Sequence, residues 1–192
     1  MNNYEYIIAS LPVLQQDDRN AASLDAGALL GAIREQLSSK DRGKFDFFLS
    51  GREPENLCED FYRRALASGQ GFTREWYAYD LQMRNAKVRY LNSALGRPSG
   101  QDVIALTEDD GAADDEEIRA VLERKDILAR EKGLDDLLWR KAEDLALMHV
   151  FDLDVILSFT ARLQIIDRWL RLDPETGRVL FRKLVQEIRN NK

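Results

Sequence analysis

Residues 134–170 read LDDLLWRKAEDLALMHVFDLDVILSFTARLQIIDRWL, and this stretch decides the fold. It contains two helical patterns, Leu134–Val150 and Leu153–Leu170, whose apolar residues cover most of the circumference. Neither pattern has the roughly 18 unbroken apolar residues of a membrane span. A helix that is apolar nearly all round must be buried, so we expect both helices to pack between other helices. Asp152, between the two patterns, predicts an N-cap for the second helix.

Further helical patterns precede this stretch. Apolar periodicity and capping residues predict helices at about 23–38 and 41–49, and another that opens at Pro54 or Asn56. Tyr4–Pro12 is short and aromatic, and its pattern fits an extended segment and the start of a helix equally.

The longest pattern covers Phe72 to Leu95, with Thr73 as the expected N-cap. It carries two apolar stripes, one through Trp76 and Tyr90 and one that Asn85 and Asn92 interrupt. Two stripes predict contacts on two sides of the helix. Any buried asparagine on it needs hydrogen-bond partners.

Three more helices are expected on the C-terminal side. A polar helix is predicted at Glu116–Glu131, with Ile118, Leu122 and Ile127 inward and Gly133 as its stop. The run Asp173-Pro174-Glu175 is typical of a helix start. The chain is therefore predicted to be all-α, a bundle of about seven or eight helices with a short extended or ambiguous N-terminal segment.

Charge divides the chain into parts. Residues 101–133 hold 11 acidic and five basic side chains, and this surplus equals the net charge of −6. Its core, residues 108–117, is too acidic and polar to pack, which predicts a solvated linker at 97–115. The linker separates a helical part at 1–96 from another at 116–192, or connects them within one continuous domain.

Composition narrows the compartment and the partners. The single cysteine, Cys58, fits a reducing cytoplasm, and we expect it to be a small buried residue in a helix. No secretory signal is evident at the start. The acidic balance disfavours nucleic acid, and the basic residues between Leu81 and Gln101 suit either solvent or an acidic partner.

Motifs for catalysis are lacking in the sequence. His149 is the only histidine and lies on an apolar helical stripe, so we interpret it as a structural residue with a backbone or carboxylate partner. Glu143, Asp144, Asp152 and Asp154 are expected at helix surfaces or caps. We therefore predict no catalytic residue, no cofactor and no metal site.

Two tryptophan–arginine groups are candidates for contact with a protein partner, because Trp and Arg are enriched at interface hot spots. The candidate residues are Trp76, Arg84, Asn85, Arg168 and Trp169. The other interpretation is that the tryptophans belong to the core, and that Arg168 pairs with Asp144 or Asp167.

Three sets of residues, in order along the chain, resemble one known family. They are Tyr4-x-Tyr6-Ile7-Ile8-Ala9-Ser10-Leu11-Pro12, then Arg74-Glu75-Trp76 with Met83-Arg84-Asn85, and then Trp139…His149-x-Phe151-Asp152…Leu163-x-Ile165-x-x-Arg168-Trp169…Gly177. Together they span most of the chain and resemble a bacterial family of uncharacterised proteins associated with V/A-type ATPases. That family in turn resembles the central-stalk connector of these ATPases.

This resemblance implies an all-α, non-catalytic connector between the rotor shaft and the membrane ring. Shaft and ring subunits would be its partners, and it would be cytoplasmic or peripheral on the inner face of the membrane without inserting into it. The chain is shorter than the full three-lobed connector. Two other hypotheses stay open: a free-standing helical adaptor or regulatory protein with an unrelated partner, and a small enzyme that uses carboxylates such as Glu143 or Asp152.

Overall fold

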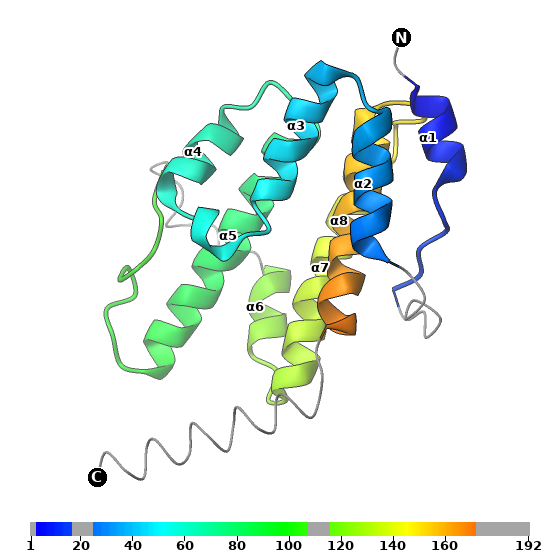
Figure 1. Cartoon of the computed structure of the whole chain (residues 1–192). Helices are drawn as coiled ribbons and strands as arrows, with labels where there is room; N and C mark the ends of the chain where they lie inside the picture. The colour runs from blue at the N-terminus through cyan, green and yellow to red at the C-terminus, as the bar shows by residue number, and fades with distance from the viewer. Residues whose placement is uncertain (1–2, 17–24, 107–115, 172–192) are drawn as a thin grey trace, which may run out of the picture.

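The computed structural model describes residues 3–16, 25–106 and 116–171. Within these ranges the chain forms eight α-helices and a 3-10 turn at Pro54–Asn56, without a strand (Figure 1). This confirms the all-α prediction, and the ambiguous N-terminal segment is a helix. The helices are α1 Tyr4–Ser10, α2 Ala26–Gln36, α3 Ser39–Ser50, α4 Glu59–Leu66, α5 Gly71–Ala94, α6 Glu116–Leu122, α7 Ile127–Ala146 and α8 Leu153–Leu170.

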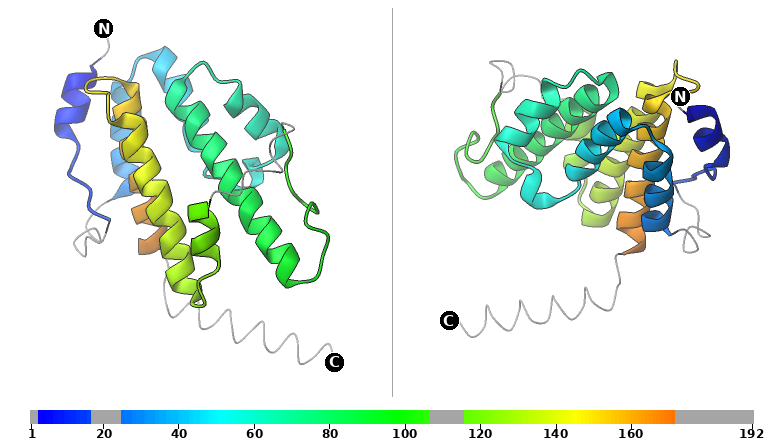
Figure 2. Two further views of the ribbon diagram at one scale, coloured as in Figure 1. Left: turned by 180° about the vertical axis from the view of Figure 1, so that it is seen from behind. Right: turned by 45° about the horizontal axis from the view of Figure 1, so that its top comes forward.

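Helix α8 is the centre of the bundle. It contacts α1, α2, α3, α5 and α7, and its buried residues lie on most of its circumference (Figure 2). The buried hydroxyl groups are satisfied, since Ser158 donates to the carbonyl of Ala142 at 2.7 Å and Thr160 to that of Ile156 at 2.8 Å. Asp152 caps the helix by accepting from the backbone N–H groups of Asp154 and Val155. The predicted burial and the predicted cap are both confirmed.

The parts of the chain before and after the acidic linker share one hydrophobic core. A large cluster of buried side chains joins Phe48 and Trp76 with Leu157 and Leu163. A smaller cluster packs Met83 and Ala86 of α5 against side chains of α6 and α7. This packing favours the alternative of one continuous domain. The acidic residues 108–115 and the predicted helix start at Asp173 lie outside the described residues.

The break between α6 and α7 corrects one prediction. The helix expected at 116–131 ends at Leu122, and Asp126 caps a new helix by accepting from the N–H groups of Leu128 and Ala129. Gly133 does not stop a helix but lies inside α7. A Cβ atom there would be 2.8 Å from Cγ1 of Val121, so the glycine is needed for the close approach of α6 to α7.

Three other local predictions are also wrong. The N-cap of α5 is Gln70, whose side chain accepts from the N–H of Thr73, while Thr73 is buried inside the helix. Ile127 was expected to point inward and is 71% exposed. Cys58 is exposed and lies just before α4, because the inward face of that helix begins at Phe61.

The two asparagines of α5 are buried and have the partners that burial requires. Asn85 exchanges two hydrogen bonds with the backbone of Ile104, at 2.8 and 3.1 Å. Asn92 donates to the carbonyl of Gln101 at 2.7 Å. Both side chains therefore hold the segment after α5 against that helix. None of the described helices combines the length and the apolar character that crossing a membrane requires.

Replacing Asn85 with alanine should lower the free energy of unfolding by about 1–3 kcal/mol, because the polar backbone groups of Ile104 lose their buried partner. Urea denaturation followed by circular dichroism measures this change. The matched control is Asn56→Ala, which removes one exposed hydrogen bond to Ser50 and should cost less than about 0.5 kcal/mol. Equal losses for the two variants would contradict the anchoring role of Asn85.

Candidate functional site

One buried carboxylate, Asp135 of α7, organises the contact between α7 and α8. The side chain is 2% exposed, and both of its oxygens accept hydrogen bonds from the last turn of α8. The indole Nε1 of Trp169 donates to Oδ2 at 2.7 Å, and Nη1 of Arg168 donates to Oδ1 at 3.1 Å. Adjacent residues of α8 thus bind the same carboxylate.

The network extends to α5 through Glu131, one helical turn before Asp135. Glu131 accepts from Nη2 of Arg168 at 2.7 Å and from Nζ of Lys87 at 3.3 Å. Burial raises the pKa of Asp135, although the charge of Arg168 and the hydrogen bond from Trp169 oppose this rise. Burial also acts on Glu131, but the bonds from Arg168 and Lys87 outweigh it and lower the pKa of that carboxyl. Both carboxylates therefore serve to join helices.

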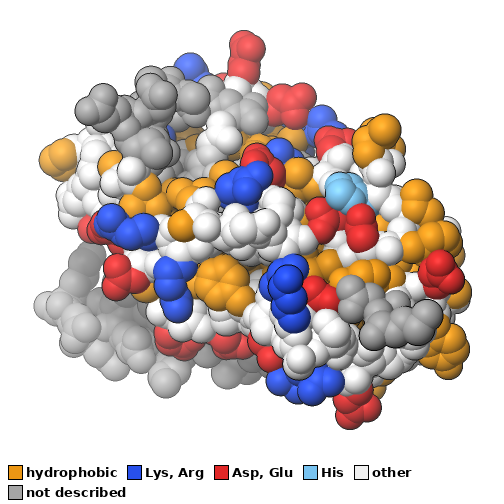
Figure 3. Space-filling model, turned by 90° about the horizontal axis from the view of Figure 1, so that it is seen from above, with side chains coloured by type: hydrophobic (Ala, Val, Ile, Leu, Met, Phe, Trp, Pro, Cys, Tyr) orange, Lys and Arg blue, Asp and Glu red, His pale blue; other side chains and the backbone are white. Residues whose placement is uncertain are grey.

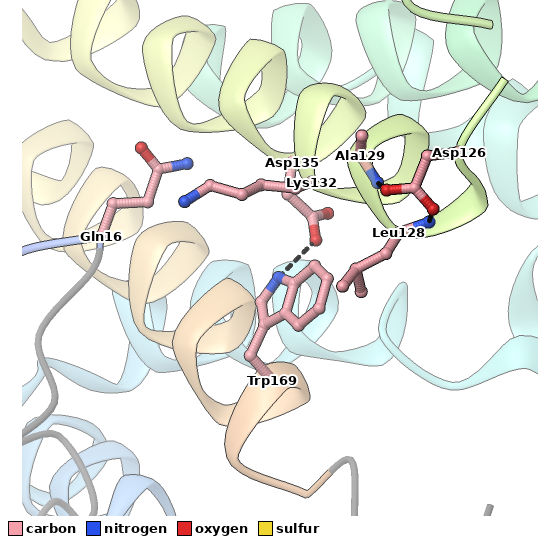
Figure 4. Close-up of a pocket in the computed structure, with 7 residues that line it drawn as sticks. All are labelled: Gln16, Asp126, Leu128, Ala129, Lys132, Asp135 and Trp169. Carbon is pink, nitrogen blue, oxygen red and sulfur yellow. Dashed lines mark hydrogen bonds between the residues drawn. The ribbon is translucent and has the colours of Figure 1, made fainter. Parts of the chain in front are cut away.

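A cavity of about 370 Å³ opens beside Trp169 (Figure 4). We call it the Trp169 cavity. The Trp169 ring is half-buried, and the side chain of Leu128, which is 62% exposed, points toward it. The lining residues come from the N-terminal segment, α7 and its cap, and α8: Gln16, Asp126, Leu128, Ala129, Lys132, Asp135 and Trp169.

The polar groups of this cavity already have partners in the chain. Nε2 of Gln16 donates to Asp136 at 2.6 Å, Asp126 caps α7, and Asp135 accepts from α8. Sites for small polar ligands need several polar groups that converge on the ligand. Here the surfaces left for an occupant are largely the ring of Trp169 and the side chains of Leu128 and Ala129, so the cavity suits an apolar group.

A second cavity of about 340 Å³ lies on the other side of Asp135, between α5 and α7. Arg84, Lys87 and Arg168 contribute to its wall, together with apolar side chains of both helices. Asp80 also lines it and accepts a hydrogen bond from the hydroxyl of Tyr62 at 2.6 Å. Burial raises the pKa of the Asp80 carboxyl against the opposing effects of Tyr62, Arg84 and Lys87.

The five candidate contact residues fall into two groups. Trp76 and Asn85 are 7% and 2% exposed, so they contact their own chain and offer a partner almost no surface. Arg84 and Arg168 line the cavity between α5 and α7, and Trp169 lines the other.

The expected partners of Arg168 were wrong. Arg168 pairs with Glu131 and Asp135, whereas Asp167 pairs with Arg52 and Arg171. Successive residues of a helix point in different directions, so Arg168 and Asp167 face different neighbours. Sequence reasoning missed Asp135 and Leu128, because nothing local distinguishes them from surface residues of a helix.

His149 lies in the connection after α7 and not on a buried stripe. Its Nδ1 is 2.5 Å from Oδ2 of Asp152, and its Nε2 is 3.6 Å from Oδ2 of Asp154. The hydrogen bond with Asp152 raises the pKa of His149. These three side chains are of types that bind metals. However, each ring nitrogen faces a carboxylate and Asp152 also caps α8, so the arrangement matches an ion-paired clamp.

The other acids lie at helix surfaces or caps, as predicted. Glu143 accepts from the indole Nε1 of Trp139 at 2.9 Å and from Arg162 at 3.2 Å. The carboxylates proposed for an enzyme, Glu143 and Asp152, thus have structural contacts.

Comparison with known proteins gives one similarity. The model of a family described as "Protein of unknown function (DUF2764)" matches residues 109–192 of this chain. No curated protein and no solved structure matches it. The chain is therefore similar, over its C-terminal part, to a family whose function is unknown. Of the described residues, the match includes α6, α7 and α8, and with them Asp135, Arg168 and Trp169.

Proposed function

We propose that this chain is a non-catalytic helical protein that binds a protein partner at the Trp169 cavity. One observation carries the proposal: the half-buried ring of Trp169 lines an open cavity while its indole N–H is satisfied inside the chain. Tryptophan in a partly enclosed pocket is typical of interface hot spots. Because Asp135 holds the ring in place before any partner arrives, little conformational freedom is lost on binding.

The partner that we propose is a rotary ATPase of the V/A type, in its shaft and ring subunits. The support for this identity is the family resemblance of the sequence, and Trp139, Arg168 and Trp169 are among the residues that carry it. An all-α fold agrees with a connector in the central stalk. The alternative is an adaptor that uses the same cavity for an unrelated partner, and one experiment separates the two.

Affinity capture from gently solubilised native membranes, with mass spectrometry of the recovered proteins, tests the proposal. The wild-type chain should recover shaft and ring subunits, and Leu128→Asp should reduce their recovery at least about tenfold, because it places a charge in the apolar part of the cavity. Ile127→Asp is the matched control, since Ile127 is 71% exposed on the same turn and does not line the cavity.

The outcomes separate the parts of the proposal. An unrelated complex that is lost with Leu128→Asp would retain the cavity and discard the ATPase. Equal recovery with both variants would show that the partner does not use the Trp169 cavity. Circular dichroism of the two variants controls for loss of folding.

A further inference from the structure

The connection between α7 and α8 exposes four large apolar side chains in five residues. We call Leu147, Met148, Val150 and Phe151 the apolar tip; they are 77%, 88%, 65% and 54% exposed. Scattered apolar residues on a surface are ordinary, but contiguous exposed ones mark interaction sites in soluble proteins. The most buried helix of the bundle, α8, begins two residues later, so the exposure of the tip does not follow from a generally polar or loose region.

The apolar tip is braced at both ends. The backbone N–H groups of Leu147 and His149 donate to the carbonyls of Asp144 and Ala146, at 3.2 and 2.9 Å, which extends the end of α7. On the other side, His149 contacts Asp152, which caps α8. The side chain of Gln70 donates to Asp154 and ties the first turn of α8 to the start of α5. The tip is therefore held in shape without a partner, which favours binding.

The surroundings of the tip are acidic. Residues 142–161 contain four carboxylates, those of Glu143, Asp144, Asp152 and Asp154, and no Lys or Arg. Figure 3, which shows the molecule from this end, has the pale-blue histidine beside acidic side chains, with hydrophobic side chains exposed close by. Acidic borders are repelled by an anionic membrane surface and by a second copy of the same tip. They are attracted to Lys and Arg.

We propose that the apolar tip is a docking surface for a protein partner that has an apolar groove bordered by Lys and Arg. Met148 and Phe151 enter the groove, and Asp144 and its acidic neighbours pair with the basic border. Apolar anchors supply the affinity, while the complementary charges select the partner and speed association.

This surface is distinct from the Trp169 cavity. The tip follows the last residue of α7, whereas Leu128 and Asp126 of the cavity lie at the first, and a helix of 20 residues is about 30 Å long. The inference therefore goes beyond the proposed function and does not depend on it. A chain with two such surfaces can connect two proteins.

Site-specific photo-crosslinking in cells tests the proposal. The full chain carries p-benzoylphenylalanine in place of Met148, and the crosslinked segment is sequenced by mass spectrometry. We expect one protein segment with apolar residues flanked by Lys or Arg. In this background, Phe151→Ser and Asp144→Lys should each lower the crosslink yield about tenfold. The matched control has the crosslinker at Leu95, which is 62% exposed at the end of α5, and its crosslinks should not respond to these variants.

Several results would overturn the proposal. Crosslinks to lipid would assign the tip to a membrane surface, and crosslinks to the same chain would assign it to self-association. A partner segment without Lys or Arg, or yields unchanged by Asp144→Lys, would remove the charge argument. Absence of any defined crosslink would show that the tip binds no protein in these cells. None of these results bears on Leu128→Asp, so the two proposals fail independently.

Discussion

Replacing Phe48 with alanine should lower the free energy of unfolding by about 3–5 kcal/mol. The Phe48 ring is 0% exposed and lies where α3 and α5 meet. Its centroid is 5.8 Å from that of Phe72, 6.2 Å from that of Trp76 and 5.6 Å from that of Tyr77. Truncation would leave a cavity among stiff aromatic rings, which cannot collapse to fill it, so the loss belongs at the upper end of the usual range.

Urea denaturation followed by circular dichroism measures this loss. Phe151→Ala deletes the same atoms from a side chain that is 54% exposed, and should change the free energy of unfolding by less than about 0.5 kcal/mol. Similar losses for the two variants would contradict the described core. Since Phe151 belongs to the apolar tip, an unchanged stability of its variant also validates its use in crosslinking.

Gly51→Ala should be the second most destabilising change, although it adds only one methyl group. A Cβ atom at Gly51 would be 2.6 Å from Cζ of Phe61 and would overlap the hydroxyl end of Tyr77. The Tyr77 hydroxyl is buried and donates to the carbonyl of Phe48 at 2.5 Å. The alanine must displace this ring, which adds about 1–3 kcal/mol of packing strain to a loss of about 1–3 kcal/mol for the broken hydrogen bond.

Gly43→Ala is the control for this prediction. Gly43 lies within α3, and a Cβ atom there would meet no atom within 4 Å. Because alanine is the better helix former, this variant should gain about 0.5–1 kcal/mol. Thermal unfolding compares the two variants directly. The same substitution should thus have opposite signs at two glycines eight residues apart, and a stabilising Gly51→Ala would disprove the close approach.

The candidate site was only partly predictable. The sequence identified Arg168 and Trp169 as a pair of interest, and the structure places both on Asp135. It could not identify Asp135 itself, because a carboxylate near two leucines of a helix is common on surfaces. The partner of Arg168 depends on how α7 and α8 are aligned along each other. That alignment is set by packing between residues more than 30 positions apart, which no local pattern records.

What the sequence determined by itself is local and periodic. The all-round apolar pattern of Leu153–Leu170 required a buried helix, Asp152 required its cap, and Asn85 and Asn92 required partners once their stripe was buried. Side-chain chemistry and the helical repeat are enough for these conclusions, since they concern one helix at a time.

Tertiary structure decided everything that depends on a second helix. Gly133 looked like a helix stop, yet it is the point where α6 approaches α7, and Trp76 looked like a surface anchor although α3 covers it. The apolar run after Ala146 looked like buried helix, but α7 ends first and leaves the apolar tip exposed. An apolar side chain has the same tendency to leave water everywhere, and only the arrangement of the other helices determines which ones find cover.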